Sequence, residues 1–188
     1  LLVTIGLGFN AVQSYAVTQS IESAFNVPVW ISGLVLPGVM GLVMFGGIRR
    51  IAVFSEIVVP LMVVGYFFVA LLVLAMNVSE IPKAFMLILR SAFGLEEVVS
   101  GGLAAAIMQG ARRGLFSNEA GMGSTPHAHA VAKVDHPAQQ GLVAIFGVFF
   151  DTFIVCTMTA LVIITSGVFK SEAMRGAAMT QAGFAQAL

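Results

Sequence analysis

The sequence predicts an all-α protein that crosses a membrane several times, and three observations support this fold class. Of its 188 residues, 59% are hydrophobic and only 10% are charged, whereas soluble domains usually carry about 25% charged residues. Several uncharged stretches reach the roughly 20 apolar residues that a bilayer-spanning helix needs. The nine basic and nine acidic residues cancel, and no basic run indicates nucleic-acid binding. A water-soluble domain and a nucleic-acid-binding protein are therefore both excluded.

The apolar stretches predict about five membrane spans. They cover residues 1–21, 27–47, 51–76, 98–132 and 141–169. The chain begins inside an apolar stretch without a methionine, so we expect an internal fragment of a longer protein. The apolar run at 84–89 is too short to cross, and we expect an amphipathic helix at the membrane interface there. The positive-inside rule groups Arg49, Arg50 and Lys133 on one side of the membrane.

Residues 98–132 do not fit a single straight span. About 35 residues at 1.5 Å each would measure roughly 52 Å, while the hydrocarbon core is roughly 30 Å thick. Glycine permits backbone conformations closed to other residues, so we expect a break between Gly114 and Gly123. Free peptide groups at such a break can face an anionic ligand and a cation. The alternative is a kinked helix whose glycines serve only close packing.

Four charged residues fall near the middle of predicted spans: Arg112, Arg113, Glu119 and Asp151. Charges inside a bilayer are costly and usually face a partner or a cavity. The structural interpretation is that an arginine pairs with Glu119 or Asp151 and holds two helices together. A role in ligand or ion binding is the alternative, and a misplaced span boundary is the third.

Other polar residues suggest where a ligand binds. Gln13 can bond an amino or carboxylate group, and Gly8 can expose backbone to a ligand, although hydrogen bonding between helices explains Gln13 equally well. Two histidines, His127 and His129, point apart at i,i+2 spacing, so we expect no transition-metal site. Ser117 lacks the G-x-S-x-G context of a serine hydrolase.

Three stretches carry a resemblance to a known family: GLFSNEAGMGSTPHA at 114–128, the apolar segment at 136–167, and GGIRRIAVFSEIVVP at 46–60. In them the sequence resembles the alanine or glycine:cation symporters, also called sodium:alanine symporters. The resemblance extends over essentially the whole chain. It implies a LeuT-like fold with inverted repeats, in which this partial transporter domain supplies core helices three to seven and 98–132 is the broken sixth helix.

The resemblance also implies a function. It indicates a multi-pass transporter of the cell membrane, surrounded by lipids, that is not an enzyme and takes up alanine or glycine with sodium, or with protons. The implied amino-acid site is formed by Gly8, Gln13, Phe116, Ser117 and Asn118. Asp151 or Thr152 would bind the coupling ion, because hard cations prefer oxygen ligands, and no other cofactor is expected. The alternative is a non-transporting membrane component that binds an amino acid on the same scaffold.

Overall fold

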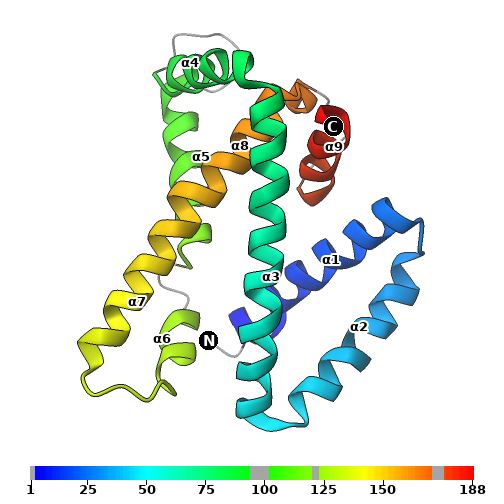
Figure 1. The fold of residues 1–188 in the computed structure, drawn as a ribbon, viewed down its shortest axis with the longest axis vertical. Helices are drawn as coiled ribbons and strands as arrows, with labels where there is room; N and C mark the ends of the chain where they lie inside the picture. The colour runs from blue at the N-terminus through cyan, green and yellow to red at the C-terminus, as the bar shows by residue number, and fades with distance from the viewer. Residues whose placement is uncertain (1–2, 94–101, 120–122, 171–175) are drawn as a thin grey trace.

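The structure, a computed structural model, describes residues 3–93, 102–119, 123–170 and 176–188. Every regular element within these ranges is helical, which agrees with the predicted all-α class. Figure 1 shows two long rods, one formed by α3 and the other by α7 and α8 together, with shorter helices packed around them.

The N-terminal part is a helical hairpin. A six-residue π-helix, η1 (Thr4–Phe9), continues directly into α1 (Asn10–Phe25), and α2 (Val29–Met44) follows. The turn forms at Asn26, whose φ of 56° lies in the left-handed region that asparagine tolerates better than most residues. Together η1 and α1 form one continuous helix of 22 residues, close to the length of the span predicted at 1–21, whereas α2, with 16 residues, is shorter than the span predicted at 27–47.

The two long rods are the helices in the described ranges that are long and apolar enough to cross a membrane. The first is α3 (Gly47–Met76), which continues through Pro60. The second joins α7 (Pro137–Phe149), the π-helix η3 (Phe150–Val155) and α8 (Cys156–Thr165) into 29 residues. These two rods match the spans predicted at 51–76 and 141–169, while the remaining three spans stay predictions.

The helix break occurs within the predicted interval. Helix α5 (Gly102–Ser117) ends at Ser117, and α6 (Ser124–His129) begins seven positions later. The chain leaves the helical path at Glu119, with φ of 51°, and re-enters it after Gly123, with φ of 81°. Gly123 fits here because it has no Cβ to clash in the left-handed region. Gly121 and the predicted span start at residue 98 lie outside the described residues.

The small buried core lies at one end of the rods. Its buried side chains come from α3, α4 (Ile81–Ala92) and α8; they are Ala70, Val73, Leu74, Ala84, Met158, Leu161 and Val162. Helix α4, in the loop where an amphipathic helix was expected, crosses the end of the rods (Figure 1). The short helices η2 (Val78–Glu80), η4 (Val168–Lys170) and α9 (Ala177–Ala187) complete this end.

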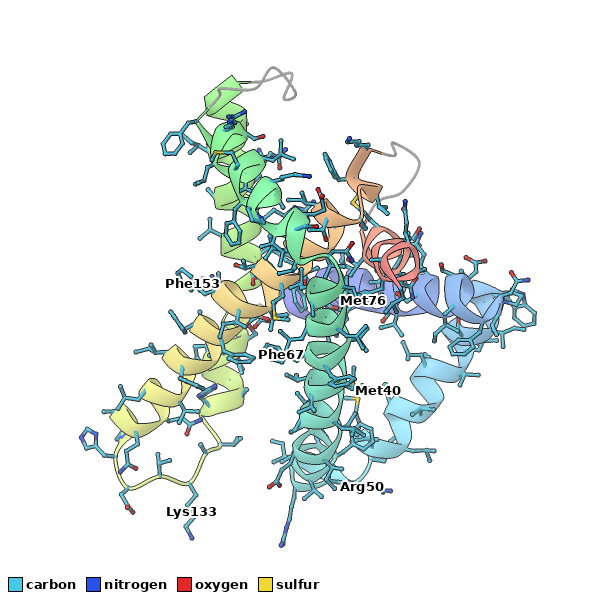
Figure 2. The ribbon with its side chains drawn as sticks, turned by 45° about the horizontal axis from the view of Figure 1, so that its top comes forward. Met40, Arg50, Phe67, Met76, Lys133 and Phe153 are labelled. Carbon is cyan, nitrogen blue, oxygen red and sulfur yellow. The ribbon has the colours of Figure 1, made fainter. Side chains whose placement is uncertain are left out.

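The opposite end carries basic residues. Figure 2 shows Arg50, in the first turn of α3, and Lys133, between α6 and α7, at the same end of the molecule. This placement agrees with the grouping that the positive-inside rule predicts. Lys83 and Lys170 lie at the core end, so both ends carry basic residues. The break between α5 and α6 lies between these two ends (Figure 1).

Candidate functional site

The end of α5 contacts the π-helical turn η3. The Ser117 hydroxyl, on the last residue of α5, donates to Asp151 Oδ2 at 2.7 Å. Ser117 Oγ also lies 3.3 Å from the Sγ of Cys156, the residue that follows η3. The break thus meets the second rod through a hydroxyl and a carboxylate.

The next residue makes a second bond to the same turn. Asn118 Nδ2 donates to Thr152 Oγ1 at 2.9 Å and to the Gly114 carbonyl oxygen at 3.0 Å. Two consecutive residues at the break therefore bind two consecutive residues of η3. Single π-helical turns are rare within α-helices and are often found at functional sites.

The predicted ion pairs are not formed. In the ranges that the structure describes, an ion pair joins Lys83 and Glu80, at 2.7 Å, and none joins Arg112 or Arg113 to a carboxylate. The side chains of both arginines are exposed on α5.

Serine hydroxyls take the place that we expected arginine to take. Ser124 donates to the Glu119 carboxylate, as Ser117 does to Asp151. Ser124 is only five residues from Glu119 and so reaches it across the break, whereas Ser117 meets Asp151 because the end of α5 packs against η3.

The first helix reaches the break through an aromatic contact. The rings of Phe9 and Phe116 lie 5.7 Å apart, centroid to centroid. Phe9 ends η1, so Gly8 precedes it directly and Gln13 follows one helical turn later. Gly8 and Gln13 are both exposed near this contact, and within the described part of the chain no side-chain hydrogen bond joins either of them to the break.

A pocket of about 370 Å³ lies beside Asn118 and Thr152. Apolar residues of the second rod form the rest of its wall: Ala144, Ile145, Val148, Phe149 and Phe153. Pockets for small ligands typically occupy about 300 to 1,000 Å³ and combine apolar walls with a few polar groups. This pocket has both properties.

The sequence interpretation missed two neighbours of the site, Phe9 and Cys156. Both are ordinary apolar residues of a span in the sequence. Only their positions in the sequence could have indicated that they lie near the site. Phe9 follows the predicted ligand residue Gly8, and Cys156 lies five residues after Asp151. The two histidines near the break have separate partners: His127 Nδ1 lies 2.5 Å from the Gly123 carbonyl oxygen, and His129 Nδ1 lies 2.8 Å from Gln140 Nε2.

Comparison with known proteins decides the family. The family model described as the sodium:alanine symporter family matches residues 1–188. The chain belongs to the sodium:alanine symporter family. Its members are transporters and not enzymes, so this chain is part of a membrane transport protein.

Named relatives of this chain come from bacteria and archaea. The probable sodium/glutamine symporter GlnT of Bacillus subtilis is 44% identical over 183 residues, covering 96% of this chain and 38% of the relative. The sodium/proton-dependent alanine carrier protein of Bacillus sp. PS3 is 42% identical, covering 90% of this chain and 38% of the relative. The sodium/alanine symporter AgcS of Methanococcus maripaludis is 42% identical, covering 95% and 40%. The chain thus spans about two fifths of the length of these relatives.

Proposed function

We propose that the full-length protein is a secondary symporter that takes up a small neutral amino acid, alanine or glycine, together with sodium across the cell membrane. Family membership over residues 1–188 is the observation that carries this proposal. Two relatives are named for alanine and sodium, and one for glutamine and sodium. In this proposal the chain supplies core helices three to seven of a LeuT-like inverted repeat, with α5 and α6 as the broken helix.

The amino acid binds at the break in α5 and α6. Gln13 and Asn118 supply side-chain amides that can bond the carboxylate or the ammonium of the ligand, and Ser117 supplies a hydroxyl. Gly8 leaves room for a ligand beside η1. The ring pair of Phe116 and Phe9 forms an apolar wall suited to a side chain as small as a methyl group.

The cation binds beside the amino acid, at Asp151 and Thr152. A carboxylate and a hydroxyl are oxygen ligands, which suit a hard cation such as sodium. In the structure these oxygens accept hydrogen bonds from Ser117 and Asn118, the two residues that we assign to the substrate. An ion that binds Asp151 and Thr152 displaces the hydrogen bonds from Ser117 and Asn118. It thereby changes the contacts of the two residues at the end of α5. Binding of the ion and of the amino acid is then coupled through a shared set of atoms.

The test is transport by the reconstituted full-length protein. Proteoliposomes are loaded so that a sodium gradient and a proton gradient are imposed separately, and uptake of labelled alanine is measured. We expect accumulation when sodium is higher outside, with competition by unlabelled glycine. Binding of alanine without accumulation under either gradient would contradict the proposal and support a non-transporting amino-acid-binding component.

A further inference from the structure

A pair of hydroxyl groups connects α3 to η3. Tyr66 of α3 and Thr159 of α8 form a hydrogen bond through their hydroxyl oxygens. The Thr159 hydroxyl donates its own proton to the Val155 carbonyl oxygen at 2.8 Å. Since a hydroxyl has one proton, Tyr66 is the donor in the first bond and Thr159 the acceptor. The relay therefore runs from Tyr66 through Thr159 to Val155, the last residue of η3.

The residue that follows Tyr66 contacts the other end of the same turn. The ring of Phe67 stacks on Phe150, the first residue of η3, with 6.4 Å between centroids. Figure 2 labels Phe67 on α3, on the side of the second rod. Two consecutive residues of α3 therefore reach both ends of the six-residue turn that carries Asp151 and Thr152.

The surroundings of Tyr66 keep its hydroxyl in place. Tyr66 is half-buried against the core, and its ring meets Phe184 of α9 edge-on at 5.6 Å. A hydrogen bond in such an apolar environment is electrostatically stronger than one in water. The tyrosine is thus anchored on two sides and can hold Thr159 in a fixed position.

π-Helices are rare and occur mostly as single turns within α-helices. We therefore expect contacts from another helix to hold η3 in this conformation. A threonine bond to the carbonyl four residues earlier is local and does not select a partner helix. Thr165 makes this same bond, to Leu161 at 2.8 Å, without a tyrosine. The feature that distinguishes Thr159 is therefore the hydroxyl of Tyr66.

We propose that Tyr66 is a positioning residue for the cation site and acts through Thr159 on η3. The inference rests on the proposed function in assigning Asp151 and Thr152 to the cation. Tyr66 itself touches neither ligand. It sets the place of the π-helical turn, and with it the two oxygen ligands that the turn presents to the break.

The first experiment measures alanine uptake by the full-length protein as a function of sodium concentration. Tyr66→Phe and Thr159→Val are expected to raise the half-saturating sodium concentration about fivefold, the effect of one lost hydrogen bond. A merely structural role would lower the maximal rate through the amount of protein and leave this concentration unchanged. The double variant should be no worse than either single variant, because both remove the same interaction.

Two further variants serve as controls. Thr159→Ser keeps the hydroxyl and is expected to retain the wild-type sodium dependence, while Thr165→Val removes a local bond of the same length and should also leave it unchanged. Wild-type sodium dependence in both Tyr66→Phe and Thr159→Val would overturn the inference. If Tyr66→Phe fails to reach the membrane, Thr159→Val alone decides.

A second experiment does not depend on transport. Cys156 follows η3 directly and is exposed, so its alkylation by N-ethylmaleimide in the purified protein reports on the position of the turn. Mass spectrometry of the peptide should show a labelling rate in Tyr66→Phe that differs from the rate shared by the wild type and Thr165→Val, because the turn that precedes the thiol has moved. Equal rates would overturn the inference. Absence of sodium-driven uptake in the wild type would instead contradict the proposed function, and the labelling would still decide the role of Tyr66.

Discussion

Asn118 Nδ2 donates to Thr152 Oγ1 at 2.9 Å and so joins the end of the broken helix to the π-helical turn of the second rod. These two residues lie 34 positions apart in the sequence. Ser117 and Asp151, the residues directly before them, make the parallel bond at 2.7 Å. The residues that we assign to the amino acid are therefore the same ones that hold the residues assigned to the ion.

The first prediction concerns Asn118. Asn118→Ala in the full-length protein should lower sodium-driven alanine uptake about tenfold or more, because it removes a ligand amide and the bond to Thr152 together. The matched control is Asn77→Ala. Asn77 Nδ2 bonds the Val73 carbonyl at 3.0 Å, the same local bond that Asn118 makes to Gly114, but without a partner on another helix. Equal uptake by the two variants would remove Asn118 from the site.

The second prediction separates stability from ion binding at Asp151. Because Asp151 is exposed and no arginine pairs with it in the described residues, Asp151→Ala and Asp151→Asn should differ in unfolding free energy by less than about 0.5 kcal/mol. Both variants should nevertheless raise the half-saturating sodium concentration about tenfold, because each removes the charged ligand. Thermal unfolding in detergent and uptake at varied sodium test the two statements.

The exposed carboxylate of Glu22, at the far end of α1, provides the control for Asp151. Glu22→Gln should change neither stability nor sodium dependence. A clearly less stable Asp151→Ala than Asp151→Asn would instead indicate a buried cation beside Asp151, contributed by the full-length protein.

Part of the site could be predicted from sequence alone. The break between α5 and α6 follows from a stretch too long to cross straight and from glycines such as Gly114 and Gly123, both local properties. The uninterrupted apolar run of α3 likewise predicts its long helix. Such features depend on the residues of one segment, so the sequence of that segment is enough to predict them.

The partners across helices could not be predicted in the same way. Whether Asp151 meets Arg112 or Ser117 depends on how the second rod lies against α5, which is a property of packing. The π-helical turns η1 and η3 have no composition that distinguishes them from ordinary α-helix. The contact of Phe9 with Phe116 depends on one of these turns, and it was missed for that reason.

The third prediction concerns substrate size at Phe116. Removing its ring takes away part of the apolar wall, enlarges the space for the ligand side chain and breaks the contact with Phe9. An aromatic pair of this kind contributes about 0.5 to 1.5 kcal/mol beyond the burial of its area. Phe116→Ala should therefore raise the half-saturating alanine concentration about fivefold and improve competition by the larger glutamine relative to glycine. Phe45→Ala, at a residue 96% exposed, is the control and should leave both quantities unchanged. An unaltered preference in Phe116→Ala would show that the ring does not bound the amino-acid site.

The last prediction concerns the packing of α9 on α8, which holds Phe184 against Tyr66. A Cβ added at Gly183 would lie 3.3 Å from Ser166 Oγ and 3.7 Å from Ile163 Cα. Gly183→Val should therefore lower the unfolding free energy by about 1 to 3 kcal/mol, because its methyl groups overfill this contact. Gly141→Val, on α7, has nothing within 4 Å of the added Cβ and should be close to neutral.

Gly183→Ala tests the same contact with a smaller added side chain. The serine side chain can turn aside by a few tenths of an ångström, and alanine gains about 1 kcal/mol of helix propensity over glycine. We therefore expect the alanine variant to be as stable as the wild type, with only the valine variant losing stability in thermal unfolding. Because α9 supports Tyr66 through Phe184, Gly183→Val should also raise the half-saturating sodium concentration, as Tyr66→Phe does. A destabilised Gly183→Val with wild-type sodium dependence would show that α9 stabilises the fold without reaching the cation site.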